Sequence, residues 1–165
     1  MPKNNKEKVS YYYDLQEALQ RLENKQIAFL KTTIAEGKKQ TKEIKNINWA
    51  KELAFFEQAN LNRSAFRNSY QEEIVPRQDS IFISYTSQND ELKVKKLQIV
   101  LLKDSSLAMV EAFIKTDNYL YSSEKHLKLR CKDNSVESYH IRGRQKMIFT
   151  EPEYFEVGAE KKRNN

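Results

Sequence analysis

The hydrophobic pattern changes its period near residue 80, and this change limits the folds open to the chain more than any other feature. Short separators rich in Asp, Asn and Ser, which stabilise turns, divide the rest of the chain into strand-like segments. The segments alternate or are apolar throughout, and they cover residues 80–87, 92–102, 107–116, 118–129, 135–149 and 154–159. Short connections join antiparallel neighbours, because a parallel pair needs a crossover of roughly a dozen residues or more. The sequence therefore predicts a mainly antiparallel meander of six strands over residues 80–160.

Residues 9–76 follow a helical period instead and are predicted to form two helices. The first apolar stripe consists of Leu15, Leu19, Leu22, Phe29 and Ile34. Gly37 follows it as a candidate C-cap. The second stripe consists of Trp49, Leu53, Phe56, Phe66 and Tyr70. We expect this helix to begin near Asn46 or Asn48, which can cap a first turn, and to end at Pro76.

Together these patterns predict an α+β fold, with two N-terminal helices packed on one face of a roughly six-stranded, mainly antiparallel, curved sheet. The 165 residues fit a single domain, and 39% of them are hydrophobic. The polar, lysine-rich ends, residues 1–8 and 161–165, are predicted to be frayed tails. The longest apolar runs are far shorter than the ~20 residues that cross a bilayer, so we expect a soluble domain without a transmembrane segment.

Composition argues against several functions. The 29 basic and 23 acidic residues give a net charge of +6, which favours attraction to anionic partners but does not identify one. With only 3 glycines and no phosphate-loop, dinucleotide-binding or zinc-protease motif, the sequence predicts no enzyme and no cofactor. Cys131 is the only cysteine, so no disulfide within the chain is possible. The first ten residues contain no apolar segment typical of a signal peptide.

The segment "YHIRGRQKMIF" places a basic residue at every second position, and strand alternation puts these residues on one face. With the preceding strand, the candidate anion-binding face comprises His126, Lys128, Arg130, His140, Arg142, Arg144 and Lys146. Sheets that bind nucleic acid combine such charge with exposed aromatic side chains. Here Tyr139 and Phe149 alternate onto the other face. We therefore interpret the basic face as the solvated side of a sheet, with an anion-binding surface as the alternative.

The turn between the two basic strands determines which residues face each other. A three-residue hairpin at residues 132–134 places His126 opposite His140, whereas a slip of one pair places His126 opposite Arg142. Two imidazoles without a carboxylate or thiolate make a weak site among so many cations, so no metal site is predicted. Cys131 alternates onto the inward face, where a free cysteine behaves as a small hydrophobic residue.

The run "DNYLYSSEKHLKL…YHIRGRQKMIF…EYFEVGAE", from Asp117 to Glu160, resembles the sheet half of uncharacterised exported proteins of Gram-negative bacteria, which are often lipid-anchored. In those proteins a helical N-terminal part precedes a β-meander that ends in repeated Tyr-x-Ile-x-Gly-type strands. This sequence departs from the pattern at Tyr154, where "FEVG" follows with the register shifted by one, and it carries no lipid-attachment cysteine. The resemblance implies a cell-envelope location and a binding or structural role, without a catalytic residue.

Two functions follow from these features. The first is a non-enzymatic cell-envelope protein that binds a hydrophobic ligand or a protein partner. It would lie in the periplasm or envelope if a signal sequence has been removed, and in the cytoplasm otherwise. The second is an intracellular, nucleic-acid-associated module that uses the basic strand face. We prefer the first, because the charged positions of the basic strand lack aromatic residues in phase with them.

Overall fold

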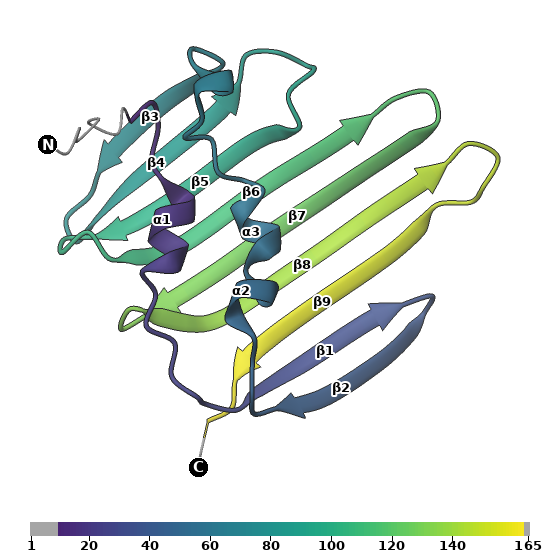
Figure 1. The fold of residues 1–165 in the computed structure, drawn as a ribbon, viewed down its shortest axis with the longest axis horizontal. Helices are drawn as coiled ribbons and strands as arrows, with labels where there is room; N and C mark the ends of the chain where they lie inside the picture. The colour runs from purple at the N-terminus through teal and green to yellow at the C-terminus, as the bar shows by residue number, and fades with distance from the viewer. Residues whose placement is uncertain (1–9, 164–165) are drawn as a thin grey trace, which may run out of the picture.

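The computed structural model describes residues 10–163, and within them the strands form one nine-stranded antiparallel sheet. The strand order is β2-β1-β9-β8-β7-β6-β5-β4-β3, so the first strand of the chain, β1, pairs with the last, β9 (Figure 1). The strands are β1 (Phe29–Ala35), β2 (Lys38–Ile44), β3 (Tyr70–Pro76), β4 (Ser80–Ser87), β5 (Val94–Leu102), β6 (Leu107–Asp117), β7 (Tyr121–Lys132), β8 (Ser135–Met147) and β9 (Glu153–Lys161).

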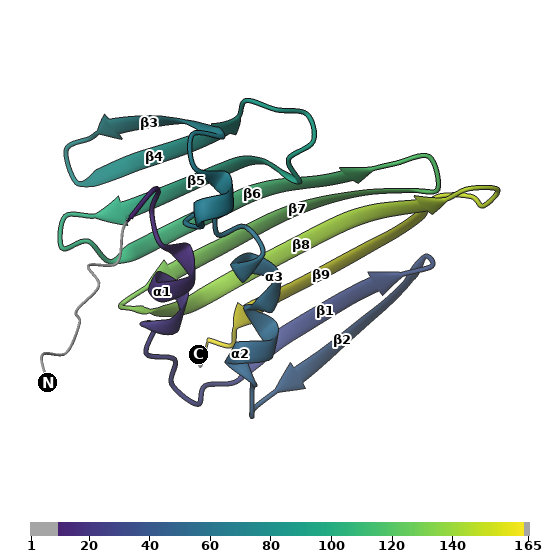
Figure 2. The same cartoon turned by 45° about the horizontal axis from the view of Figure 1, so that its top comes forward.

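The helices in residues 10–163 are short and lie on one face of this sheet (Figures 1 and 2). They are α1 (Leu15–Gln20), α2 (Trp49–Glu52), α3 (Ala54–Glu57) and the 3-10 helix η1 (Ser64–Phe66). Asp14 caps α1 and Asn48 caps α2, each through a side-chain oxygen that accepts a first-turn N–H. We call the face beneath the helices the covered face and the opposite one the open face.

The prediction of a long first helix is wrong, because residues 29–44 form the β1–β2 hairpin. Phe29 and the β-branched residues after it favour a strand, and a short apolar run does not distinguish a strand from a helix by period alone. Gly37 does adopt a left-handed conformation, with φ 73°, but it follows Glu36 in a hairpin turn and does not end a helix. Residues 38–44, which follow this turn, form the edge strand β2.

The predicted second helix is also wrong, because the chain between Asn48 and Tyr70 turns repeatedly. Asn60 lies where the helical stripe is interrupted, and it is buried. Its Oδ1 accepts a hydrogen bond from the backbone N–H of Leu15 at 3.1 Å, which joins the two helical segments. Residues 70–76 then form β3, the other edge strand, where the missing N–H of Pro76 is tolerated. The fold is therefore mainly sheet, and the predicted pair of helices on six strands is not formed.

The hydrophobic core lies between the helical segments and the covered face. Leu53 and Phe56 are buried as expected, and Trp49 is partly buried with its ring 5.0 Å from that of Phe29. The completely buried side chains include Leu15, Phe56, Leu61, Leu97, Ile99, Val110 and Leu129. Because burying apolar surface stabilises a fold by about 25 cal/mol per Å² removed from water, this layer favours folding.

Most residues of the two predicted frayed tails lie outside the part of the chain that the structure describes. Residues 1–8 and 164–165 lie outside the described part of the chain. Lys161 is not in a tail, because it is the last residue of β9 and pairs with Phe29. The next backbone N–H, that of Lys162, donates a hydrogen bond to the carbonyl of Ala28 at 2.8 Å.

Candidate functional site

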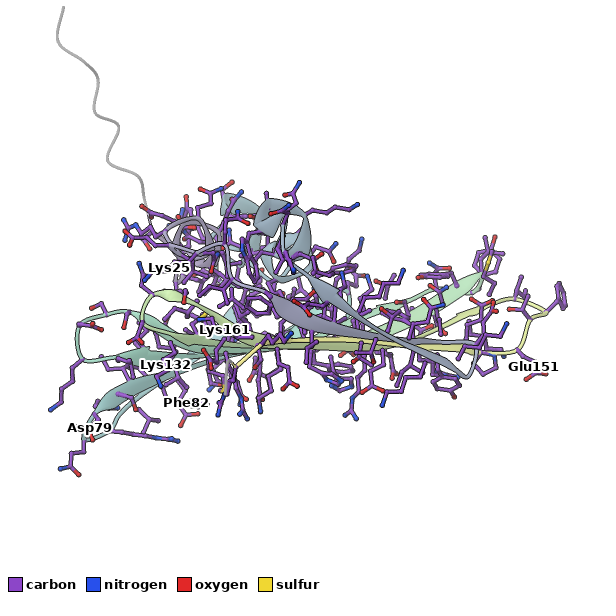
Figure 3. The ribbon with its side chains drawn as sticks, turned by 90° about the horizontal axis from the view of Figure 1, so that it is seen from below. Lys25, Asp79, Phe82, Lys132, Glu151 and Lys161 are labelled. Carbon is purple, nitrogen blue, oxygen red and sulfur yellow. The ribbon has the colours of Figure 1, made fainter. Side chains whose placement is uncertain are left out.

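The open face carries all the residues of the predicted basic face. Strand pairing places His126 opposite Phe113 of β6 and Arg142 opposite Glu156 of β9, so side chains from neighbouring strands share this surface. Figure 3 shows the sheet from its edge, with the helical segments on one side and side chains such as Phe82 on the other. The seven predicted residues are His126, Lys128 and Arg130 of β7 and His140, Arg142, Arg144 and Lys146 of β8.

The register follows the second of the two predicted alternatives. His126 lies opposite Arg142, and Lys128 lies opposite His140. The turn has two central residues, Asp133 and Asn134, with φ 51° and 57°, and not the three of the first alternative. A β-bulge at the start of β8 shifts the pairing between Arg130 and Cys131, and the extra residue sets the observed register.

Because His126 and His140 are not opposite each other, they do not form a cross-strand pair of imidazoles. Within residues 10–163, no group of three or more His, Cys, Asp or Glu side chains is arranged to hold a metal ion.

Glutamates from the flanking strands contact part of the basic face. Lys128 lies 2.7 Å from Glu111 of β6, and the Nε2 atom of His140 lies 2.5 Å from Glu156 of β9. Among the described residues, Arg130, Arg142, Arg144 and Lys146 make no ion pair within 4.0 Å. The carboxylates opposite Arg142 and Arg144, those of Glu156 and Glu124, are not within ion-pair distance of them, so these guanidinium groups can contact an anionic partner.

Two aromatic side chains lie on the open face beside these charges. The sequence of β8 alone predicted none there. Phe113 stacks on His126 with ring centroids 4.6 Å apart and an interplanar angle of 23°. Tyr154 lies opposite Arg144 and is 64% exposed. Sequence reasoning missed both because it followed the period of β8 alone. The alternation of β6, which groups Phe113 with Glu111, was the signal that could have found the first.

Three shallow grooves adjoin on the open face. The first, of about 390 Å³, lies over Thr32, Lys128, His140 and Gly158. The second, of about 430 Å³, lies over Phe113, His126, Lys128, His140 and Arg142. The third, of about 460 Å³, is lined by Ile34, His126, Arg142, Arg144, Tyr154 and Glu156. Neighbouring grooves share residues, so together they form one trough across β6, β7, β8, β9 and β1.

The groups with raised pKa values lie on the other side of the sheet. Burial raises the pKa of the Cys131 thiol to about 12, and Cys131 packs against the core as the alternation predicted. Burial also raises the pKa of Tyr139, whose hydroxyl donates a hydrogen bond to Glu52. Burial is the main cause of both shifts, and the hydrogen bond to Glu52 adds to that of Tyr139.

Comparisons with protein-family models, with curated proteins and with solved structures gave no match for this chain. None of the helices in residues 10–163 is both long enough and apolar enough to span a bilayer.

Proposed function

We propose that this chain is a non-enzymatic binding protein of the cell envelope, and that an acidic segment of a protein partner binds along its open face. The observation that carries the proposal is the trough, in which Arg142 and Arg144 remain without an ion-pair partner among the described residues, beside the exposed Tyr154. Arginine binds carboxylates through two parallel hydrogen bonds. Glu111 and Glu156 flank these cations and would repel an acidic segment lying out of register.

A protein partner fits this geometry better than an enclosed hydrophobic ligand. The space between the helices and the sheet is filled by side chains such as Leu15, Phe56 and Leu61, which are 0% exposed. The grooves lie on the opposite, open face and are lined by charged and polar groups as well as apolar ones. An extended segment with both acidic and apolar side chains would match such a surface.

Two other parts of the proposal have separate support. The envelope location rests on the resemblance of residues 117–160 to exported proteins. Binding through the face and not through an edge is supported by β2 and β3, whose exposed lysines, glutamates and Pro76 disfavour the addition of another strand.

A second candidate function is binding of single-stranded nucleic acid. It is favoured by Phe113 and Tyr154, because base-binding sheets place aromatic rings among cations on one face. Phe113 is already stacked on His126, and Glu111 and Glu156 would repel phosphate groups. We therefore rank this candidate below the protein partner.

The experiment compares two fluorescently labelled probes, a glutamate-rich peptide and a single-stranded oligonucleotide, by anisotropy over a range of salt concentrations. We expect the peptide to bind more tightly. The double variant Arg142→Gln/Arg144→Gln should weaken peptide binding at least about tenfold, because charge-assisted hydrogen bonds are lost. Its folding should change by less than about 0.5 kcal/mol, since both side chains lie on the solvated face.

The matched control is Arg63→Gln/Arg67→Gln, which removes the same charge from exposed positions in the covering segment. It should leave peptide binding within about twofold of the unmodified protein, since distant exposed charges are screened by salt. Equal losses in both double variants would show non-specific attraction and would refute the proposal. Tighter oligonucleotide binding, with a log–log salt slope that flattens by about 1.4 in the Arg142→Gln/Arg144→Gln variant, would favour the second candidate instead.

A further inference from the structure

Two neighbouring hairpin turns present exposed apolar side chains at one end of the sheet. Tyr119 and Leu120, in the β6–β7 turn, are 85% and 48% exposed. Met147, Ile148 and Phe149, at the β8–β9 turn, are 60%, 44% and 97% exposed. We call these five residues the apolar tip. Figure 1 shows both turns at the same end of the sheet, beyond the part that the helices cover.

Hydrogen bonds fix the two turns relative to each other. The backbone N–H of Ile148 donates to the carbonyl of Leu120 at 2.9 Å, which ties one turn to the next. The side chain of Asn118 accepts from the backbone N–H groups of Leu120 and Tyr121, both at 3.0 Å. Thr150 closes the second turn through its hydroxyl, which lies 3.2 Å from the backbone nitrogen of Met147. The apolar tip is therefore an ordered surface with both turns held together.

The backbone of Phe149 is in a conformation that this residue type rarely adopts. Its φ is 64°, in the left-handed region, where a bulky side chain is a genuine outlier. Other turns of the sheet have Glu36, Gly37, Ser105, Asp133 and Asn134 at positive φ, and none of these residues is aromatic or β-branched. The phenyl ring of Phe149 projects into solvent, so core packing does not explain why the backbone adopts this conformation. Such an outlier points to a functional role for the side chain.

Charges around the apolar tip are nearly balanced. Arg144 and Lys146 lie behind it on the open face, while Asp117, Glu151 and Glu153 flank the turns. Figure 3 places Glu151 at this end of the sheet, far from Lys132 and the polar turn at the other end. Attraction by net charge is thus weak here, and the apolar and aromatic side chains dominate what this end can bind.

We propose that the apolar tip inserts into the interfacial layer of a lipid bilayer and seats the protein on a membrane surface. Five side chains on two turns are few compared with the roughly 20–30 residues per partner in a standard protein interface. A membrane surface, in contrast, receives a small projecting group of apolar and aromatic side chains, and Tyr and Phe favour the interfacial depth. The grooves of the open face are not lined by these five residues, so the site is separate from the proposed partner surface.

The test measures co-sedimentation with vesicles of zwitterionic phosphatidylcholine at high salt concentration, which suppresses binding by the cations of the open face. The unmodified protein should bind, and Phe149→Asn should weaken binding by about tenfold to a hundredfold, because a buried phenyl group is lost. Asn adopts positive φ readily, so the melting temperature of this variant should be unchanged or higher. A fall in melting temperature would assign Phe149 to folding and overturn the proposal.

The control is Ile74→Asn/Ile81→Asn, which removes apolar side chains that are 53% and 39% exposed on the edge strand β3 and its neighbour β4. It should bind vesicles as the unmodified protein does. In a second measurement, a Phe149→Trp variant should show fluorescence quenched by brominated lipid, whereas Trp49, on the covered side, should not. Equal binding by the Phe149→Asn variant, no binding by the unmodified protein, or binding only to anionic vesicles at low salt would each contradict insertion of the apolar tip.

A failure of this proposal is distinguishable from a failure of the proposed function. The peptide-binding experiment needs no vesicles, and it depends on Arg142 and Arg144 and not on Phe149. If Phe149→Asn abolished peptide binding and left vesicle binding intact, the apolar tip would belong to the protein-partner surface, and the membrane proposal would be wrong.

Discussion

Along β7, neighbouring residues belong to two different environments. Leu127 and Leu129 are 2% and 0% exposed beneath the helical segments. His126 and Lys128, each one residue away, lie on the open face, where the first stacks on Phe113 and the second pairs with Glu111. The same backbone therefore builds a packed core on one side and a charged surface on the other. Substitutions on the covered face should change stability, and those on the open face should change binding.

The largest expected effect is the loss of a core side chain on the covered face. Phe56 of α3 is 0% exposed, and its ring lies 6.3 Å from that of Tyr139 in an edge-to-face arrangement. Replacing Phe56 with Ala removes this contact and leaves a cavity, which should lower the free energy of unfolding by about 3–5 kcal/mol. Chemical denaturation, with the midpoint and the slope fitted together, measures the change.

Phe113→Ala is the matched control on the open face. Phe113 is only half-buried and has the ring of His126 as its stacking partner, so we expect a loss of about 1 kcal/mol. Equal losses of unfolding free energy in the two variants would show that the open face contributes to stability as much as the covered face does. The two faces would then not differ in their roles.

The second expected effect is a loss of stability at alkaline pH. Burial raises the pKa of Tyr70 from 10.0 to about 12, and it also raises the pKa values of Tyr85 and Tyr139. Below pH about 10 all these phenols are protonated in both states. Above pH about 10 the unfolded chain releases protons that the folded chain retains, so the free energy of unfolding falls as pH rises toward the folded pKa.

Two measurements check this effect. Denaturation midpoints should be nearly constant from pH about 7 to about 8 and should fall from pH about 9 to about 12, because the buried Cys131 thiol, whose pKa is raised from 9.0, adds to the effect of the phenols. Phenolate absorbance should also rise at higher pH for the folded protein than for the protein in denaturant. Coincident absorbance curves would show that the tyrosines of the covered face are accessible to solvent in the folded protein.

The sequence allowed the strands after residue 80 to be located, because each alternates over several residues and is bounded by polar turns. The six segments expected there correspond to β4 through β9. The N-terminal half was not predictable in this way. Strand β1, residues 29–35, is short and lies between β2 and β9. Of these two neighbours, β9 is more than a hundred residues further along the chain. Such non-local pairing overrides local helical spacing and leaves no mark in the local pattern.

The candidate site was predictable to a similar extent. Alternation alone grouped His126 and Arg142 on one surface. The carboxylates that contact part of it, Glu111 and Glu156, come from the strands on either side, so they could be assigned only once the strand order was known. The register depended on a β-bulge at the start of β8, and the polar residues there do not specify one register.

The smallest expected effects come from two glycines that face opposite sides of the sheet. A Cβ atom at Gly143, on the covered side, would lie 2.3 Å from Cζ of Phe155 and 3.2 Å from the carbonyl oxygen of Glu124. A Cβ atom at Gly158, on the open side, would meet Cδ2 of His140 at 3.5 Å, which is an ordinary contact.

The two Gly→Ala variants should therefore change stability in opposite directions. Gly143→Ala forces the ring of Phe155 away from the strand, and it should cost about 1 kcal/mol because the ring is half-exposed and can move. Gly158→Ala meets no such obstacle and restricts the unfolded chain, so it should be neutral or stabilising by up to about 0.5–1 kcal/mol. Denaturation midpoints at equal slopes compare the two variants. If Gly158→Ala were as destabilising as Gly143→Ala, the open face at β9 would be as tightly packed as the covered one, and a partner could not enter the groove above Gly158.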